Sequence, residues 1–431
     1  MDPEGRKTLV MIKNDEGNAS TSINDLNDEM LLEILCQVDC YSTALRCKTV
    51  SKRWCSIVSA PSFVAEGFVK HRDIINEKEQ PWTFLSTMTM WDKNIVTAVV
   101  TPPCCERILR SPILSLQFLP FPSKVIATFR DLNLCLGVNP VTGEGVFYIC
   151  NLLTKQWLPL PPSPTHREVN WAALVCQEGR GFRVVVAQSM LEGRYYLGTA
   201  CTINLLIYLS DTCQWKNIDI VIESQPYGVG SCHRSFVGVV CKGMVLVHRD
   251  IVFGAFDPFD VTDTFEGTLT AIALPLPPKE PDMRLRKTPE VLLESCGKLI
   301  AIESMCLILR SDLKGNLIAG SQAWHIWKLD PRPENEVVVG WELISMLHGE
   351  IQVKGSLSVV DGDNKFKFVG VHPNKEHLVY LISVSQNQLV LCDTKSNVLE
   401  PLMIPVPPHQ LVTSYKLEFP RWPVPYPWLL S

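Results

Sequence analysis

The chain has 431 residues, of which 46% are hydrophobic and 20% are charged, and its formal net charge is −5 at pH 7. This balance is typical of a globular protein, and the length allows about three domains, or fewer if an all-β domain runs long. The mild acidity and the absence of a long basic run exclude any electrostatic case for nucleic acid or an anionic membrane surface as a partner.

The N-terminal segment, residues 1–22, is polar and carries Gly, Asn and Ser. It has no apolar h-region, so we predict a disordered segment and no signal peptide. No stretch of the sequence reaches the ~18 uninterrupted apolar residues of a membrane span. The 16 cysteines are scattered and include no Cys-x-x-Cys pair. That usage favours a reducing compartment, the cytoplasm and/or the nucleus, and does not support a metal site.

Three short helices are predicted between residues 26 and 63. Asn27 is a good N-cap, and the acidic residues Asp28 and Glu29 follow it at the positive end of the helix dipole. Ser42 and Ser51 can cap the second and third helices. The apolar residues of this stretch, which need cover, are Met30, Leu31, Ile34, Leu35, Val38, Leu45, Val50, Trp54, Ile57 and Val58. Because fewer than about 40 residues rarely bury enough apolar surface to be stable alone, we expect a partner protein to complete this core.

Three motifs follow one another in this stretch. They read Leu26-Asn27-Asp28-Glu29-Met30-Leu31-Leu32-Glu33-Ile34-Leu35, then Val50-Ser51-Lys52-Arg53-Trp54, then Pro61-Ser62-Phe63. The pattern resembles an F-box, which implies that the helices bind a Skp-family adaptor. The residues that this resemblance assigns to the adaptor interface, or to its shape, are Leu26, Asn27, Met30, Leu31, Ile34, Leu35, Val50 and Trp54.

One position departs from the F-box pattern. Asn27 stands where the family has Pro, so the helix should still start, while the contact that Pro makes with the adaptor is lost. The alternative to an F-box is a three-helix appendage that packs on its own C-terminal domain.

A repeat begins after a charged linker. From Pro81 onward, runs of Val, Ile, Leu and aromatic residues alternate with turn residues and frequent Pro, which is typical of an all-β domain. Imperfect units of roughly 60 residues recur, each a strand, an Asp or Asn turn and a second strand entered by Trp or Leu. Trp157, Trp215 and Trp341 mark such entries. We predict that these side chains occupy equivalent positions and lie in the core between neighbouring repeats.

Two hairpins at this period form one four-stranded blade, and a ring of blades hides the sheet edges. The pattern resembles the kelch-like, F-box-associated β-propellers of plant F-box proteins, although the Gly-Gly pair of kelch repeats is absent. The implied fold class is α+β and multidomain, with a short N-terminal three-helix F-box and a mostly β propeller of six blades, plus or minus one. The predicted parts are a disordered segment (1–22), the F-box (23–70), a linker (71–80), the kelch-like propeller (81–410) and a tail rich in Pro and aromatic residues (411–431).

The tail and the loops carry further features. Alternating Pro between residues 419 and 428 favours an extended segment. Docking of this segment on the propeller is favoured over a free ligand for an aromatic groove, because exposed Trp and Leu would be a liability. Seven arginines near predicted loops can form a basic rim on one propeller face, although solvated loop charges are the simpler interpretation: Arg107, Arg110, Arg130, Arg180, Arg183, Arg234 and Arg310.

A search for catalytic constellations finds no phosphate-binding loop, no dinucleotide fingerprint, no nucleophile elbow and no His-Glu-x-x-His motif. We therefore predict no catalytic residues, no cofactor and no metal. The resemblance implies the substrate-recognition subunit of an SCF-type cullin–RING ubiquitin ligase. The F-box would bind the Skp-family adaptor and, through it, the cullin, while the propeller would bind an unknown substrate protein. The alternative is a propeller scaffold or a small-molecule-sensing protein that acts outside the ligase.

Overall fold

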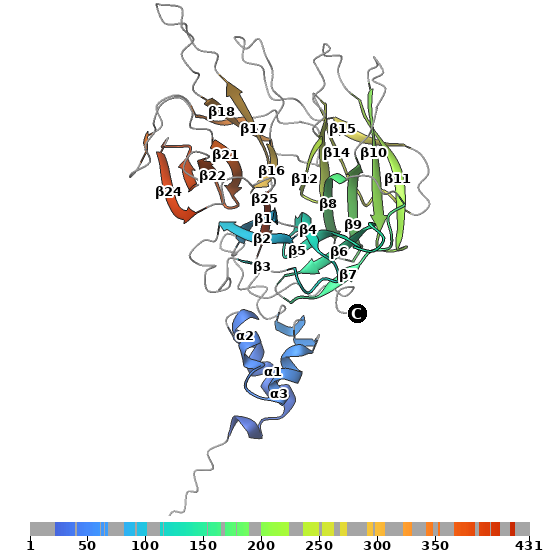
Figure 1. Ribbon diagram of the computed structural model, residues 1–431, viewed down its shortest axis with the longest axis vertical. Coiled ribbons are helices and arrows are strands. Elements are labelled where there is room, and N and C mark those ends of the chain that lie inside the picture. The colour runs from blue at the N-terminus through green and yellow to red at the C-terminus, as the bar shows by residue number, and fades with distance from the viewer. Residues whose placement is uncertain are drawn as a thin grey trace, which may run out of the picture.

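The computed structural model describes the N-terminal helices and most of the strands. The described residues are 22–38, 41–60, 62–63, 65–67, 82–90, 93–100, 113–114, 116–152, 154–164, 169–177, 179–188, 200–223, 236–249, 252–262, 268–273, 291–295, 298–306, 322–329, 342–347, 352–353, 366–383, 388–396, 398–405 and 414–418. The helices lie at the blue, N-terminal end, and the strands that follow form the larger part of the molecule (Figure 1).

A short 3-10 helix, Ile23–Asp25, precedes α1 (Asp28–Cys36), α2 (Tyr41–Cys47) and α3 (Lys52–Ser59). Asn27 caps α1 as predicted, because its side-chain oxygen accepts a hydrogen bond from the Met30 backbone N–H at 2.8 Å. Ser51 caps α3 in the same way, accepting from the Trp54 N–H at 3.2 Å. The cap predicted at Ser42 is wrong, since α2 already begins at Tyr41.

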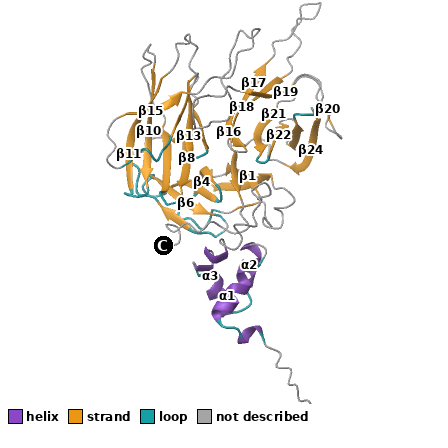
Figure 2. Ribbon diagram, turned by 180° about the vertical axis from the view of Figure 1, so that it is seen from behind, coloured by secondary structure: helices purple, strands orange, loops and turns teal. Residues whose placement is uncertain are grey.

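The helices pack around a small apolar core of their own. Its buried members are Leu31, Leu35, Cys36, Ala44, Val58 and Phe63, and the partly buried Leu32, Leu45, Cys47, Trp54 and Ile57 pack against them. Leu31 and Leu35 are one turn apart and so lie on the same face of α1, and this face is turned toward the core. The three helices stand together as one unit beside the sheets in Figure 2, where they are purple.

The strands form antiparallel four-strand meanders, or blades. The first has the order β25 (Ser414–Glu418), β1 (Trp82–Met90), β2 (Lys93–Val100) and β3 (Ile113–Leu114). The second comprises β4 (Ser123–Phe129), β5 (Leu132–Val138), β6 (Gly145–Asn151) and β7 (Trp157–Pro159). The third comprises β8 (Val169–Gln177), β9 (Gly181–Gln188), β10 (Ala200–Leu209) and β11 (Gln214–Glu223).

The blades that follow repeat this order. One comprises β12 (Phe236–Cys241), β13 (Met244–Arg249), β14 (Val252–Phe256) and β15 (Thr268–Ala273), and the parallel pairing of β15 with β11 joins it to the preceding blade. The next comprises β16 (Val291–Ser295), β17 (Lys298–Cys306), β18 (Gln322–Leu329) and β19 (Glu342–Leu347). The last comprises β21 (Phe366–His372), β22 (Lys375–Ser383), β23 (Gln388–Asp393) and β24 (Val398–Pro405), with β20 (Gln352–Val353) parallel to β24.

The blades form a closed ring. The first strand of each blade contacts the first strand of the next, from β4 through β8, β12 and β16 to β21, and β25 contacts both β21 and β4. Strand β25 comes from the predicted tail, and its antiparallel pairing with β1 joins the two ends of the β region. The predicted propeller fold is confirmed. The number of blades stays a prediction, because residues outside the described ranges are not assigned to strands.

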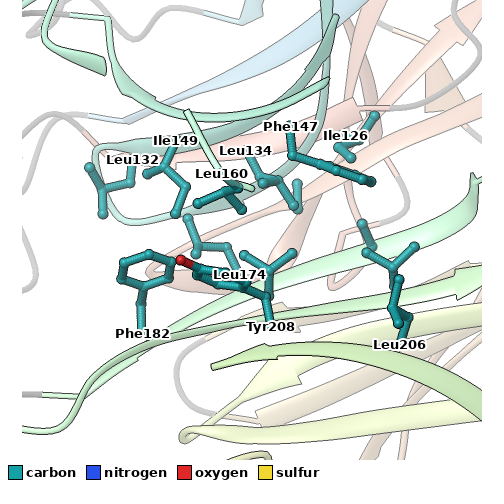
Figure 3. Close-up of a cluster of buried hydrophobic side chains, with 14 residues drawn as sticks. Ile126, Leu132, Leu134, Phe147, Ile149, Leu160, Leu174, Phe182, Leu206 and Tyr208 are labelled. Carbon is teal, nitrogen blue, oxygen red and sulfur yellow. The ribbon is translucent and has the colours of Figure 1, made fainter. Parts of the chain in front are cut away.

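Apolar layers fill the space between neighbouring blades, and Figure 3 shows one of them. One layer joins Leu132, Leu134 and Ile149 of the β4–β7 blade to Leu174 and Phe182 of the β8–β11 blade. A second layer lies on the other face of the β8–β11 blade and reaches Phe256 and Phe259. Because both faces of a blade are buried, its strands read as continuous apolar runs and not as alternating ones.

Two of the three marker tryptophans occupy equivalent positions. Trp157 and Trp215 both lie at the start of the fourth strand of a blade, paired across the ladder with Cys150 and Tyr208. Trp215 packs against the layer between blades, as predicted, and its indole N–H donates to the Pro161 carbonyl at 2.9 Å. The core position predicted for Trp157 is wrong, because this side chain is 39% exposed. Trp341 lies outside the described residues.

Candidate functional site

The first helix presents apolar side chains to solvent. Met30 is 53% exposed and Ile34 is 44% exposed, and the two are one helical turn apart on α1. Side chains at positions i and i+4 of a helix lie on the same face. Met30 and Ile34 therefore form one exposed apolar strip, in a helix whose other apolar stripe is already buried. Exposed apolar surface of this kind marks an interaction site when it is grouped.

The predicted adaptor residues divide into two sets. Leu31 is 0% exposed and Leu35 is 2% exposed, so both belong to the core of the helical unit and not to its surface. Trp54 is partly buried against the same core. These side chains hold α1 in place, whereas Met30, Ile34 and Val50 are exposed.

Val50 lies in the turn between α2 and α3. Its side chain is 61% exposed, and its backbone N–H donates to the Cys47 carbonyl at 3.1 Å. The turn is therefore held by the end of α2. The Val50 side chain, one of the apolar residues that the sequence analysis expected a partner to cover, lies at the surface.

Arg53 ties the entry of α1 to the start of α3, a role that sequence analysis missed. Its Nε donates to the Asp28 carboxylate at 2.7 Å, and its other nitrogens donate to the carbonyls of Asn24 and Leu26. The Leu26 carbonyl therefore faces inward, toward Arg53. An arginine in α3 gives no sequence signal of a partner 25 residues earlier, because the contact depends on how the helices cross.

Two parts of the chain match known families. The F-box domain model matches residues 23–65. The model described as "F-box protein At3g26010-like, beta-propeller" matches residues 133–403. The chain belongs to this family. The resemblance to F-box proteins with a C-terminal propeller is thereby confirmed, and a general role in substrate recognition follows from this pair of domains.

Comparison with solved structures finds distant neighbours of the F-box protein. The crystal structure of a nidogen/laminin complex matches with a TM-score of 0.38 and 11% identity, covering 78% of this chain and 98% of that chain. TolB from Acinetobacter baumannii matches with a TM-score of 0.35 and 7% identity, covering 84% and 72%. YCF48 from Cyanidioschyzon merolae matches with a TM-score of 0.35 and 8% identity, covering 75% and 86%. A comparison with curated proteins gave no match.

The chemistry of the described residues suits binding more than catalysis. Domains of the F-box and propeller types are typical of non-catalytic adaptor proteins. No cluster of His, Cys, Asp and Glu that could hold a metal ion occurs in the part of the chain that the structure describes. Burial raises the pKa of the Cys47 and Cys176 thiols, which opposes formation of the reactive thiolate. Among these residues, no helix has the length and apolar character needed to cross a membrane.

Proposed function

We propose that this F-box protein is the substrate-recognition subunit of an SCF-type cullin–RING ubiquitin ligase. Its helices bind a Skp-family adaptor and, through it, the cullin, while its propeller binds the protein to be modified. The chain itself catalyses no covalent step. It raises the local concentration of substrate beside the ubiquitin-loaded enzyme, which is how tethering accelerates transfer. The complex acts in the cytoplasm and/or the nucleus.

One observation carries this proposal. The strip formed by Met30 and Ile34 is exposed on the helix that matches the F-box, while the same helix has filled its own core with Leu31 and Leu35. An apolar strip that its own domain leaves uncovered supports a partner that covers it. The exposed Val50 adds to the apolar surface of the helical unit.

The test is co-purification of the adaptor and cullin with the full chain. In the variant Met30→Asp/Ile34→Asp, both charges would be buried on binding. The cost of several kcal/mol should lower recovery of the adaptor by a factor of a hundred or more. Both positions are exposed, so the helical unit should stay folded. Leu35 is unsuitable for this test, because a charge there would disrupt the helical core itself.

A matched control comes from the same helix. Glu33 is exposed on α1, and Glu33→Gln removes one charge without changing the size of the side chain. This variant should retain the adaptor. If the double Asp variant also retains it, the proposed function is wrong. A chain that never recovers the adaptor would act as a propeller scaffold outside the ligase.

A further inference from the structure

The turns at one end of three neighbouring blades carry basic side chains. Arg130 lies between β4 and β5, Arg180 between β8 and β9, and Lys242 between β12 and β13, while Lys155 lies between β6 and β7. All four residues are exposed. In a meander, the turn between the first two strands and the turn between the last two lie at the same end. Each blade therefore places these turns together.

Contacts between neighbouring blades show that their basic turns lie at the same end of the propeller. The Arg180 guanidinium donates to the carbonyl of Phe259, which lies in the turn between β14 and β15, at 2.8 Å. Phe129, next to Arg130, and Cys176, near the end of β8, pack against the same apolar layer, which places the β4–β5 turn beside the end of β8. The parallel pairing of β11 with β15 shows that the fourth strands of the β8–β11 and β12–β15 blades run in the same direction. The basic turns therefore lie on one face of the ring.

Three of these basic residues occupy strained backbone positions. The φ angles are 52° at Arg130, 60° at Lys155 and 51° at Lys242. Glycine adopts such left-handed conformations without cost, whereas a residue with a Cβ pays about 1 kcal/mol. The backbone conformation of these turns therefore favours glycine and does not by itself select a long cationic side chain.

The carboxylates of the same turns are mostly engaged within the fold. Asp211 pairs with the buried Arg183 at 3.1 Å, and Asp131 accepts a hydrogen bond from the Asn151 side chain at 2.8 Å. Asp257 accepts from the Phe259 backbone N–H at 2.8 Å, and Asp260 is exposed. By contrast, the side chains of Arg130 and Lys155 form no ion pair with any carboxylate that the structure describes.

An exposed aromatic residue accompanies the charges. Trp157 follows Lys155 by two positions and begins β7, at the same end of the blade. Its indole is 39% exposed, and one of its edges meets the Tyr148 ring at 5.7 Å between centroids. Tryptophan and arginine are the residues that most often dominate binding energy at protein interfaces. An exposed Trp at the same end of the blade as these cations therefore suits a ligand with both negative and apolar groups.

We propose that this face, formed by Arg130, Lys155, Arg180, Lys242 and Trp157 and here named the turn surface, binds an acidic polypeptide segment that carries an apolar side chain. A nucleic acid fits less well, because the chain has a formal net charge of −5 and no long basic run. The identity of the segment rests on the proposed function: it would belong to the recruited substrate protein.

The experiment measures fluorescence anisotropy of a labelled peptide with the full chain. The probe is a peptide of alternating Glu and Gly with one central Leu, and its Gln counterpart serves as the uncharged comparison. We expect the Glu peptide to bind, the Gln peptide to bind much more weakly, and the affinity to fall as salt is raised above about 0.1 M. A Glu peptide that does not bind, or that binds no better than the Gln peptide, would overturn the proposal.

The variant Arg130→Gly/Lys155→Gly removes two charges and relieves two left-handed residues. Because glycine suits both left-handed positions, the variant should stay folded, and the midpoint of its urea unfolding checks this. Binding of the Glu peptide should weaken about 5- to 30-fold in this variant. Trp157→Ala should weaken it by about tenfold or more. Unchanged affinity in the double glycine variant would show that the turn surface does not bind the peptide.

A matched control lies at the opposite end of the same hairpin. Lys124 is exposed at the start of β4, so Lys124→Gln removes one charge far from the turns and should leave binding unchanged. A phosphorylated version of the peptide that binds more tightly would support the proposal and identify the modified form as the source of the charge. Duplex DNA that binds as tightly as the peptide would contradict it, as would full competition by inorganic phosphate.

Adaptor recovery is scored on the same preparations. Because the helices are not part of the turn surface, Arg130→Gly/Lys155→Gly should retain the adaptor. A chain without substitutions that recovers the adaptor but does not bind the Glu peptide overturns the turn surface alone, whereas one that binds the peptide without any adaptor overturns the proposed function alone.

Discussion

Single glycines let aromatic rings of one blade reach the backbone of the next. Gly238 in β12 lies against the indole of Trp171, whose N–H donates to the Gly238 carbonyl at 2.7 Å. Gly370 in β21 lies in the same way against the Phe84 ring of β1. A Cβ at either position would overlap the ring. Sequence could not predict these pairs, because the partners lie far apart in the chain and no motif or period relates them.

We expect Gly370→Ala to destabilise the propeller by about 1–3 kcal/mol through overpacking. The Phe84 ring has little room to retreat, because it is buried and meets the rings of Trp82 and Tyr380 at 5.3 and 5.9 Å between centroids. The midpoint of urea unfolding measures the effect. Gly145→Ala is the control, since a Cβ there would meet only a Leu136 methyl group at 3.3 Å. Equal losses in both variants would contradict this explanation.

Helix starts were predictable where a side chain alone sets them. Asn27 and Ser51 each accept a hydrogen bond from a backbone N–H three residues later, and both caps were read from residue type and spacing. The start of α2 was not predictable from Ser42, because serine is only mildly unfavourable inside a helix and packing decides there.

The candidate site was likewise predictable only in part. Helical periodicity identified the apolar positions of α1, whereas only the crossing of the helices decides that Leu31 faces inward and Met30 outward.

The cap of α1 is open to a direct test. Asn27→Ala removes the acceptor for the Met30 N–H and should cost the helical unit about 1 kcal/mol, while Asn27→Ser, which keeps an acceptor, should cost much less. Hydrogen exchange of the first-turn amides of α1 reports the difference, with faster exchange expected in the Ala variant. If the two variants exchange alike, the cap does not hold this helix.

At the scale of the whole molecule, the repeat predicted a closed propeller but not the strands that close it. Imperfect units of similar composition were visible in the sequence, because every blade needs the same alternation of strand and turn. The pairing of β25 with β1 was not visible, since it joins residues at opposite ends of the β region, with register Trp82 to Glu418. Closure depends on the ring as a whole, and no local pattern encodes it.

The contact region between β1 and the β21–β24 blade combines aromatic packing with a partly buried histidine. Trp82, Phe84, Tyr380 and Leu389 form its apolar core. The His372 ring lies 5.0 Å from the Trp82 ring, and its Nδ1 accepts a hydrogen bond from the Asn374 backbone N–H at 3.1 Å. Burial, followed by the positive charges near it on Lys375 and His377, lowers the pKa of His372 to about 4. The contact region therefore holds this ring in its neutral form.

This arrangement predicts that the propeller loses stability as pH falls from 7 to 5. An unfolded histidine has a pKa of about 6.5, so in this window the unfolded chain binds a proton that the folded chain does not, and the free energy of unfolding decreases. Because the ring is partly exposed, we expect a loss of about 1–2 kcal/mol at most. His372→Asn removes the titrating group and keeps a side-chain acceptor for the Asn374 N–H. Urea unfolding of both proteins at pH 7 and pH 5 should show a smaller loss in the variant. Equal losses of unfolding free energy in the two proteins would mean that His372 does not cause this pH dependence.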